Sequence, residues 1–223
     1  VLMLEPRLPL ERRRLMCSRA GARSLVRVRD ARAADEDLDV PVACVVDGAT
    51  AEAPGERSVA VALPRLAGDD AAYVFFTSGT TGLPKGVLGT HRGLSHFVTW
   101  QRDTFGVGPG DRVSQLTSLS FDVVMREIFL PLTSGATLCL PDQAGDLGAD
   151  RVLPWLERER ITVVHTVPSL AQSWLASPAS AVALSRLRRV FFAGEPLPGT
   201  LVTRWREAAP AARVVNLYGP TET

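Results

Sequence analysis

Hydrophobic residues fall into short runs, separated by polar, glycine-rich or proline-rich segments. The runs that predict strands are 24–28, 42–46, 71–76, 137–140, 161–166, 188–193 and 213–217. The stretches whose apolar spacing predicts helices are 7–19, a segment after Thr90, 123–132, 150–160, 168–176 and 198–208. Strands that alternate with helices of about ten residues predict right-handed crossovers. The predicted fold class is therefore α/β, with a mostly parallel sheet flanked by helices.

Local signals refine these elements. Thr90 stands where an N-terminal cap belongs, directly before a predicted helix. Pro154 is expected in the first turn of helix 150–160, where proline is tolerated because its missing N–H would have no partner. The segments 30–39 and 47–57 are rich in small or acidic residues and are predicted to be solvated connections.

Composition supports a globular domain. Of the 223 residues, 46% are hydrophobic and 22% are charged. A chain of this length can bury roughly 70% of its unfolded surface, so its core needs neither disulfides nor metal. The net charge of +1 gives no general attraction to nucleic acid or membranes. The longest apolar run, 40–46, is far shorter than the ~18–20 residues that cross a bilayer. No signal peptide is expected either.

The cysteines and the chain ends add two expectations. Cys17, Cys44 and Cys139 lie far apart without a C-x-x-C pair, which favours a reducing compartment, and the expected location is the cytoplasm. The chain begins with Val1 and ends inside a motif, so we expect it to be a piece of a longer protein.

The segment 77–86, TSGTTGLPKG, has the composition of an anion-binding loop. Its glycines let backbone N–H groups approach an anion, and its hydroxyls add donors. Lys85, the only lysine of the chain, adds a compact positive charge. The segment is not a Walker A loop, because Pro84 precedes the lysine and Gly86 follows it. The composition favours a polyphosphate ligand; the alternative is a polar hairpin that binds nothing.

Three segments of interest each follow a predicted strand: the loop after Phe76, Gly194–Pro196 and 218–223. Ligands of parallel sheets bind beyond the carboxyl ends of the strands. We therefore expect these segments to share one edge of the sheet and form one site.

The run 73–87, YVFFTSGTTGLPKGV, resembles the signature of the adenylate-forming superfamily, which includes acyl- and aryl-CoA synthetases, luciferases and the adenylation domains of nonribosomal peptide synthetases. Further segments support the resemblance in order along the chain: 8–26, 121–138, 190–197 and 216–223. It is weakest at 30–66. The resemblance implies that 1–223 is an incomplete large N-terminal part of this fold, without the small C-terminal subdomain.

The resemblance also implies ATP and Mg²⁺ as cofactors. The residues that match the loop around the β- and γ-phosphates are Thr77, Ser78, Gly79, Thr80, Thr81, Gly82 and Lys85. The residues that match other nucleotide-binding segments are Gly194, Glu195, Pro196, Asn216, Tyr218, Gly219 and Thr221. Glu222 matches a magnesium-associated glutamate, and with Thr77 and Lys85 it would form the catalytic group. The Tyr218 ring could stack on adenine or be a half-buried core aromatic.

Two features resemble the amino-acid-activating branch: Y-G-P-T-E at 218–222 and the pair Phe121–Asp122. In that branch an aspartate at this position binds the α-ammonium of the substrate. A carboxylate at the mouth of an apolar pocket suits an ammonium and leaves a plain carboxylic acid without a partner. The alternative for Asp122 is a cap or first-turn acid of helix 123–132.

The substrate pocket implied by the resemblance comprises Asp122, Val123, Arg126, His165, Phe191, Ala193 and Leu217. Arg126 departs from the family, which commonly has tryptophan there. It lies one helical turn after Asp122. Either Arg126 selects a polar or acidic side chain, or it neutralises Asp122 and weakens the case for ammonium binding. His165 is either a pocket donor or a structural histidine.

The implied reaction is attack of an amino-acid carboxylate on the α-phosphate of ATP, which gives an aminoacyl adenylate and pyrophosphate. The acyl group would then pass to phosphopantetheine on a peptidyl carrier domain, and a condensation domain is a further expected partner. The family's ribose-binding aspartate and the catalytic lysine of its small subdomain lie beyond residue 223. The fragment alone is therefore expected to be inactive or nearly so.

Two alternatives remain. An acyl- or aryl-CoA ligase would use a plain carboxylic acid, which Asp122 and Pro220 disfavour. An arginine-rich nucleic-acid-binding module could use the clusters 12–14 and 186–189, but the acidic residues nearly equal the basic ones and aromatic residues are sparse. We therefore expect neither nucleic acid nor membrane as a partner.

Overall fold

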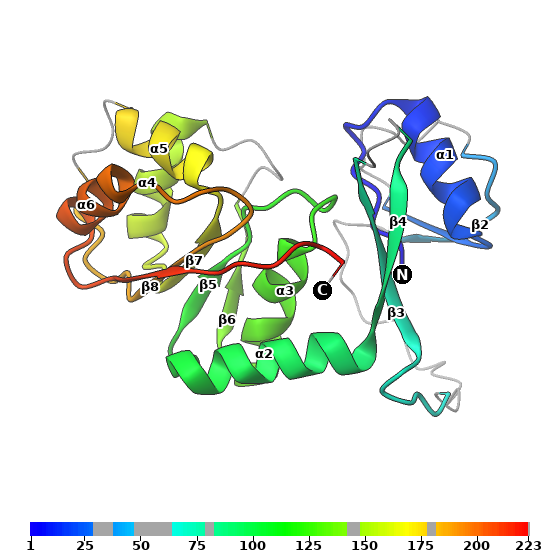
Figure 1. The fold of residues 1–223 in the computed structure, drawn as a ribbon, viewed down its shortest axis with the longest axis horizontal. Helices are drawn as coiled ribbons and strands as arrows, with labels where there is room; N and C mark the ends of the chain where they lie inside the picture. The colour runs from blue at the N-terminus through cyan, green and yellow to red at the C-terminus, as the bar shows by residue number, and fades with distance from the viewer. Residues whose placement is uncertain (29–37, 47–63, 79–82, 142–147, 178–181, 223) are drawn as a thin grey trace. The chain divides into compact units, whose positions relative to one another are not determined.

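The computed structural model describes residues 1–28, 38–46, 64–78, 83–141, 148–177 and 182–222 (Figure 1). They divide into two compact units, Val1–Gly93 and Leu94–Thr223, each with sheets of its own. Most of the predicted connection 30–39 and all of 47–57 lie outside the described residues. In the described part, no helix has both the length and the apolar character that a bilayer crossing requires.

The described residues of the first unit form one helix and two small sheets. Its elements are α1 (Leu10–Ala20), β1 (Leu25–Val28), β2 (Val42–Val46), β3 (Ala71–Thr77) and β4 (Lys85–Thr90). Strands β1 and β2 pair in parallel, whereas β3 and β4 form an antiparallel pair. Helix α1 ends at Gly21, whose φ of 61° lets its N–H reach the last helical carbonyls. The strands predicted at 24–28 and 42–46 are confirmed to within a residue.

The β3–β4 pair corrects two expectations. Strand β4 was not predicted, and β3 belongs to this two-stranded sheet and not to the large parallel sheet. The connection from Thr77 to Lys85 is too short for a parallel crossover, so the chain turns back as a hairpin. Gly89 lies opposite Tyr73, where a Cβ atom would be 2.0 Å from the tyrosine ring. Because Gly89 has no side chain, the Tyr73 ring can lie over this position of the sheet.

Helix α2 (His91–Phe105) follows β4 directly. Gly93 N donates to Thr90 Oγ1 at 3.3 Å, which confirms Thr90 as its N-terminal cap. On the apolar side of the helix, Val98, Gln101 and Phe105 are buried. Gln101 is the polar member of this buried set.

The second unit is built on a parallel sheet. Its remaining elements are β5 (Arg112–Ser114), α3 (Val123–Ser134), β6 (Thr137–Cys139), α4 (Ala149–Arg158), β7 (Val163–Thr166), α5 (Pro168–Ala176), β8 (Arg189–Phe192), α6 (Gly199–Ala208) and β9 (Arg213–Asn216). The five strands lie in the order β6-β5-β7-β8-β9, and all their pairings are parallel. The predicted α/β class, with its parallel sheet and flanking helices, is confirmed.

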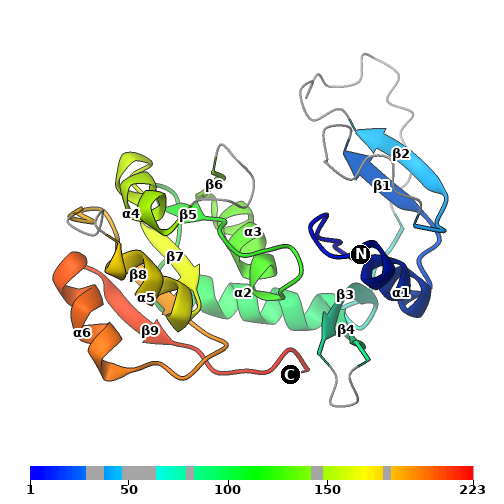
Figure 2. The ribbon, with the colours of Figure 1, turned by 90° about the horizontal axis from the view of Figure 1, so that it is seen from above.

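Helices cover both faces of this sheet (Figures 1 and 2). One apolar cluster lies between the sheet and helices α4, α5 and α6, and includes Val190 and Phe192 of β8. The other lies between the sheet and helices α2 and α3, and includes Phe191. Successive residues of β8 thus point to opposite faces, and both faces are buried. This double burial explains the continuous apolar runs of the sequence.

The position of Pro154 differs from its prediction. Helix α4 begins at Ala149, so Pro154 lies in the helix interior and not in its first turn. Its ring is exposed, whereas Val152, Leu153, Trp155 and Leu156 are buried. The packing of these four side chains outweighs the backbone hydrogen bond that proline cannot make.

Candidate functional site

The strand order creates a reversal point between β5 and β7. From β5 the chain crosses through α3 to β6, and then returns through α4 on the opposite face to β7. Strands β5 and β7 are paired at a single position, Val113 with Val163, whereas β7 and β8 share four. In open α/β sheets, ligands bind beyond the carboxyl ends of the strands at such a reversal. The topology therefore points to the residues that follow β5 and β7.

Unpartnered polar atoms concentrate in this region. Six buried side-chain nitrogen or oxygen atoms of the described residues lack a hydrogen-bond partner. Two of them are at or near the carboxyl ends of strands, Ser114 Oγ in β5 and His165 Nδ1 in β7. Two more are Ser120 Oγ, in the segment before α3, and Gln101 Oε1, in helix α2, which packs on the sheet. Because buried polar groups usually find partners, such a concentration marks a functional region.

Asp122 stands directly before α3 and is half-buried. Its side chain makes no capping hydrogen bond, which argues against the cap interpretation. The Arg126 guanidinium lies over the Phe97 ring of α2, 5.0 Å from the ring centroid. Whether Arg126 selects a side chain or neutralises Asp122 stays a prediction.

His165 is buried among residues of three elements. Its Nε2 atom lies 2.8 Å from Gln101 Nε2 of α2, and its ring stacks on Phe191 of β8 with centroids 4.9 Å apart. Burial, followed by the positive charge of Arg126, lowers the pKa of His165 to about 3. His165 is thus a neutral imidazole at any physiological pH.

Two residues of this region were missed by the sequence analysis. Gln101 lies on the apolar stripe of α2, four residues before Phe105, and Glu127 interrupts the apolar helix α3. Glu127 is buried, and its carboxylate accepts hydrogen bonds from the Leu116 and Thr117 N–H groups at 3.2 and 3.1 Å. Burial raises the pKa of Glu127 to about 7, although these hydrogen bonds oppose the rise. The sequence signal that could have identified both residues is a polar side chain on an otherwise apolar helix face.

The segments after β8 and β9 share the carboxyl edge of the sheet, as predicted for these two. Gly194 has a φ of 83°, which redirects the chain after β8. The Glu195 carboxylate accepts hydrogen bonds from Ser169 N and Oγ, both at 2.8 Å, and so caps helix α5. Tyr218 is 98% exposed, so it is not a half-buried core aromatic. An exposed phenol ring at this edge is available for stacking on a planar ligand.

The remaining predicted side chains of this unit differ in exposure. Phe191 and Ala193 are buried, and Val123 is half-buried. Leu217 packs at the margin of the cluster that contains Phe191. Of the nucleotide-segment residues, Pro196, Asn216 and Gly219 are exposed and Thr221 is half-buried. The exposed Glu222 is the last described residue.

The predicted phosphate loop lies in the first unit, at the tip of the β3–β4 hairpin. Thr77 and Lys85 are directly paired across its base. Arg19 of α1 donates to the Pro84 carbonyl at 3.1 Å and ties the base to the helix. The central residues Gly79–Gly82 lie outside the described residues. The antiparallel pairing of the strands that flank this segment is observed, and its ligand remains a prediction.

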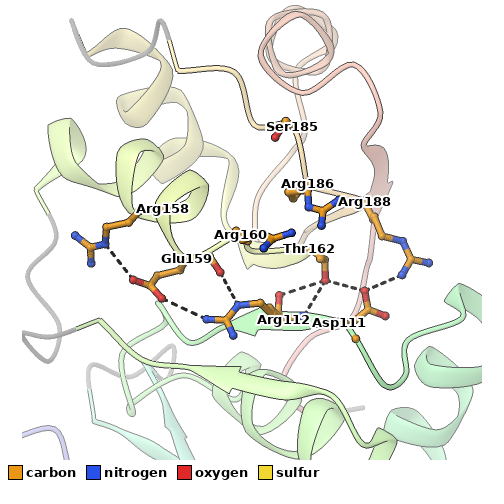
Figure 3. Close-up of a pocket in the computed structure, with 10 residues that line it drawn as sticks. Asp111, Arg112, Arg158, Glu159, Arg160, Thr162, Ser185, Arg186 and Arg188 are labelled. Carbon is orange, nitrogen blue, oxygen red and sulfur yellow. Dashed lines mark hydrogen bonds and ion pairs between the residues drawn. The ribbon is translucent and has the colours of Figure 1, made fainter.

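A separate cavity of about 510 Å³ opens at the amino edge of the parallel sheet. Figure 3 shows a connected series of polar contacts along it, through Arg158, Glu159, Arg112, Thr162, Asp111 and Arg188. These residues stand before or at the starts of β5, β7 and β8. The contacts tie strand beginnings together, at the edge opposite to the one where ligands of parallel sheets bind.

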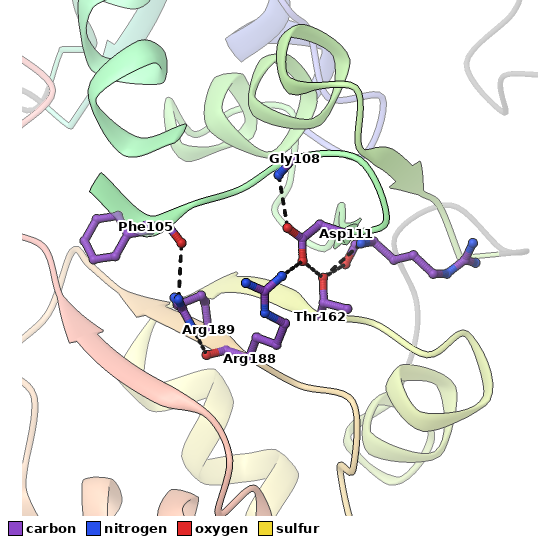
Figure 4. Close-up of polar contacts among 7 residues, drawn as sticks. Phe105, Gly108, Asp111, Thr162, Arg188 and Arg189 are labelled. Atoms are coloured by element: carbon purple, nitrogen blue, oxygen red, sulfur yellow. Dashed lines mark hydrogen bonds and ion pairs between the residues drawn. The ribbon is translucent and has the colours of Figure 1, made fainter. Parts of the chain in front are cut away.

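Asp111 is the centre of this network (Figure 4). It is 2% exposed, and its carboxylate accepts hydrogen bonds from Gly108 N at 3.1 Å, Thr162 Oγ1 at 2.7 Å and Arg188 Nη1 at 2.8 Å. It joins the turn before β5 to the starts of β7 and β8. Its role is structural.

Replacing Asp111 with alanine is expected to destabilise the protein by about 2 kcal/mol, because buried donors lose a charged acceptor. The urea midpoint of the full-length protein, followed by pulse proteolysis, measures the change. The matched control is Asp103→Ala, which breaks an exposed pair with Arg102 and should leave the midpoint unchanged. Equal midpoints for the two variants would contradict the structural role.

The family model of the AMP-binding enzyme matches residues 1–223. The chain belongs to the AMP-binding enzyme family. Among curated relatives, phosphinothricin tripeptide synthetase PhsB of Streptomyces viridochromogenes is 36% identical over 221 residues, which cover 99% of the chain and 18% of that protein. Tyrocidine synthase 3 of Brevibacillus parabrevis is 40% identical over 153 residues, which cover 69% of the chain and 2% of that protein. This AMP-binding chain thus spans less than a fifth of the length of either relative.

A solved structure agrees with the AMP-binding fold. The crystal structure of the nonribosomal peptide synthetase FmoA3 superposes with a TM-score of 0.85 at 32% identity and covers 99% of the chain and 23% of FmoA3. FmoA3 has also been solved with AMPPNP and with α-methyl-L-serine-AMP. FmoA3, which shares this fold, has therefore been observed with a bound ATP analogue and with a bound aminoacyl adenylate.

Proposed function

We propose that this chain is part of the large N-terminal subdomain of an adenylation domain that activates an amino acid with ATP. The products are an aminoacyl adenylate and pyrophosphate, and the acyl group passes to phosphopantetheine on a carrier domain of the same assembly. The observation that carries the proposal is the Asp122 carboxylate, which is half-buried without a cap bond at the carboxyl side of the β5–β7 reversal. A carboxylate in that setting suits an ammonium group.

The ATP part of the proposal rests on residues that each unit offers by itself. Thr77, Ser78 and Lys85 provide hydroxyl donors and a positive charge for the phosphates, and the exposed Tyr218 ring suits the planar adenine. Glu222 is exposed, and its carboxylate offers oxygen ligands to Mg²⁺. In proteins, Mg²⁺ is usually held by one or two carboxylates together with the phosphates of the substrate. When bound, Mg²⁺ would neutralise charge on the phosphates. The names of PhsB, tyrocidine synthase 3 and FmoA3 support an assembly that makes peptides.

Pyrophosphate exchange into ATP, measured on the full-length protein, tests this function. Each proteinogenic amino acid is compared with its des-amino counterpart, in the presence and absence of Mg²⁺. We expect exchange that depends on one or a few amino acids and is absent with the des-amino acids. Equal exchange with des-amino acids would contradict amino-acid activation and favour a ligase for plain carboxylic acids.

A further inference from the structure

Gln101 of α2 and His165 of β7 form a buried pair. Both residues are at most 1% exposed, and their Nε2 atoms are 2.8 Å apart. The amide nitrogen of glutamine only donates hydrogen bonds. With the amide nitrogen of Gln101 facing the ring, the Nε2 atom of His165 accepts and the proton of the neutral ring is on Nδ1.

The ring proton has no partner among the residues that the structure describes. His165 Nδ1 is buried and makes no hydrogen bond with any residue that the structure describes, and Gln101 Oε1 shares this condition. An unsatisfied buried donor is costly, so its persistence points to a partner that is not part of the protein. The partner of an N–H donor is an acceptor, such as an oxygen atom of a ligand.

The charged surroundings indicate which acceptor is favoured. Around the His165 ring, α2 contributes the neutral Gln101, β8 contributes Phe191, and α3 contributes Arg126. Arg126 is the only charged group whose field acts on His165 among the described residues. A positive charge beside an N–H donor favours a negatively charged oxygen. Arg126 is half-buried on a long side chain, and its guanidinium lies over the Phe97 ring.

We propose that Gln101 is a positioning residue that holds His165 with its proton on Nδ1, and that His165 and Arg126 together select an amino acid whose side chain carries a carboxylate. This inference rests on the proposed amino-acid activation. Gln101 does not touch the substrate and acts through His165. Its amide decides whether the imidazole presents a donor or an acceptor to the ligand.

Gln101→Met tests the positioning role, because it keeps the length of the side chain and removes the hydrogen bond. In pyrophosphate exchange by the full-length protein, we expect KM for the best acidic amino acid to rise about tenfold at nearly constant kcat. The advantage over the matching amide, asparagine or glutamine, should shrink by a similar factor. Thr99→Ala, at an exposed position of the same helix, is the matched control and should leave both values unchanged.

Gln101→Glu provides a second readout that a purely structural role would not move. A carboxylate at this position only accepts, so it forces a proton onto His165 Nε2 and raises the pKa of the ring toward neutrality. The wild-type KM for an acidic amino acid should not follow a histidine titration between pH 6 and 8.5. In the Glu variant we expect KM to fall at least threefold from pH 8.5 to 6, as the ring gains its second proton.

The outcomes separate this inference from the function on which it rests. If the wild-type protein prefers leucine or another apolar amino acid, the inference is overturned and amino-acid activation stands. If both Gln101 variants keep the wild-type KM, substrate ranking and pH profile, the positioning role is overturned. If no amino acid supports exchange by the wild-type protein, the proposed function itself fails. Should Gln101→Met not fold, the pH profile of Gln101→Glu decides.

Discussion

Replacing Asp122 with asparagine is expected to lower kcat/KM for amino-acid-dependent pyrophosphate exchange by more than about 100-fold. The substitution preserves shape and removes one negative charge, so the α-ammonium of the substrate loses its charged partner. A charge-assisted hydrogen bond is worth about 1.5–3 kcal/mol, and an ammonium left unpaired in a half-buried site adds a desolvation cost. Every 1.4 kcal/mol corresponds to a factor of ten.

Two comparisons make this result specific to the ammonium. The advantage of the amino acid over its des-amino counterpart should shrink in the Asp122→Asn protein, because only the amino acid uses the carboxylate. Asp103→Asn, at an exposed position at the end of α2, controls for the loss of a negative charge elsewhere. Undiminished exchange with amino acids in the Asp122 variant would overturn the assignment of this residue.

The second large effect is a loss of stability with rising pH, caused by Glu127. Burial raises its pKa from the ordinary value of 4.5 to about 7 in the folded protein. The folded state therefore binds the proton more tightly than the unfolded state. The stabilisation is complete below about pH 4.5 and is lost as the pH rises to about 7, in total about 3 kcal/mol.

The Glu127→Gln variant isolates this contribution, because glutamine has nearly the same shape and does not titrate. Urea midpoints of the full-length protein are measured from pH 5 to pH 8 for wild type, Glu127→Gln and the exposed control Glu207→Gln. We expect the wild-type and Glu207→Gln curves to fall across this range relative to the Glu127→Gln curve. Parallel curves for all three proteins would show that the carboxyl titrates at its ordinary pKa.

Elements with strong local signals were predictable. The apolar runs and helical periodicities from residue 137 onward appear as β6, α4, β7, α5, β8, α6 and β9 with small shifts at their ends. Thr90 was identified as a cap because a hydroxyl before a helix acts within one turn. Strand β4 was missed because its burial is incomplete and two of its six residues are glycine.

The candidate site was only partly predictable from the sequence. Its motif residues were found by resemblance, and the edge shared by the segments after β8 and β9 followed from strand alternation. The partner of His165 could not be found in this way, because Gln101 lies 64 residues away and the hydrogen bond depends on how α2 packs on the sheet. The position of the Arg126 guanidinium over the Phe97 ring depends equally on that packing.

The sequence by itself determined the α/β class, the order of most elements and the family, because these depend on periodicity and on contiguous motifs. Tertiary structure alone decided which strands share a sheet, where the chain reverses between β5 and β7, and which polar atoms are buried without partners. The reason is physical. Periodicity records which face of an element avoids water, whereas pairing and burial depend on residues that are distant along the chain and meet only in the folded protein.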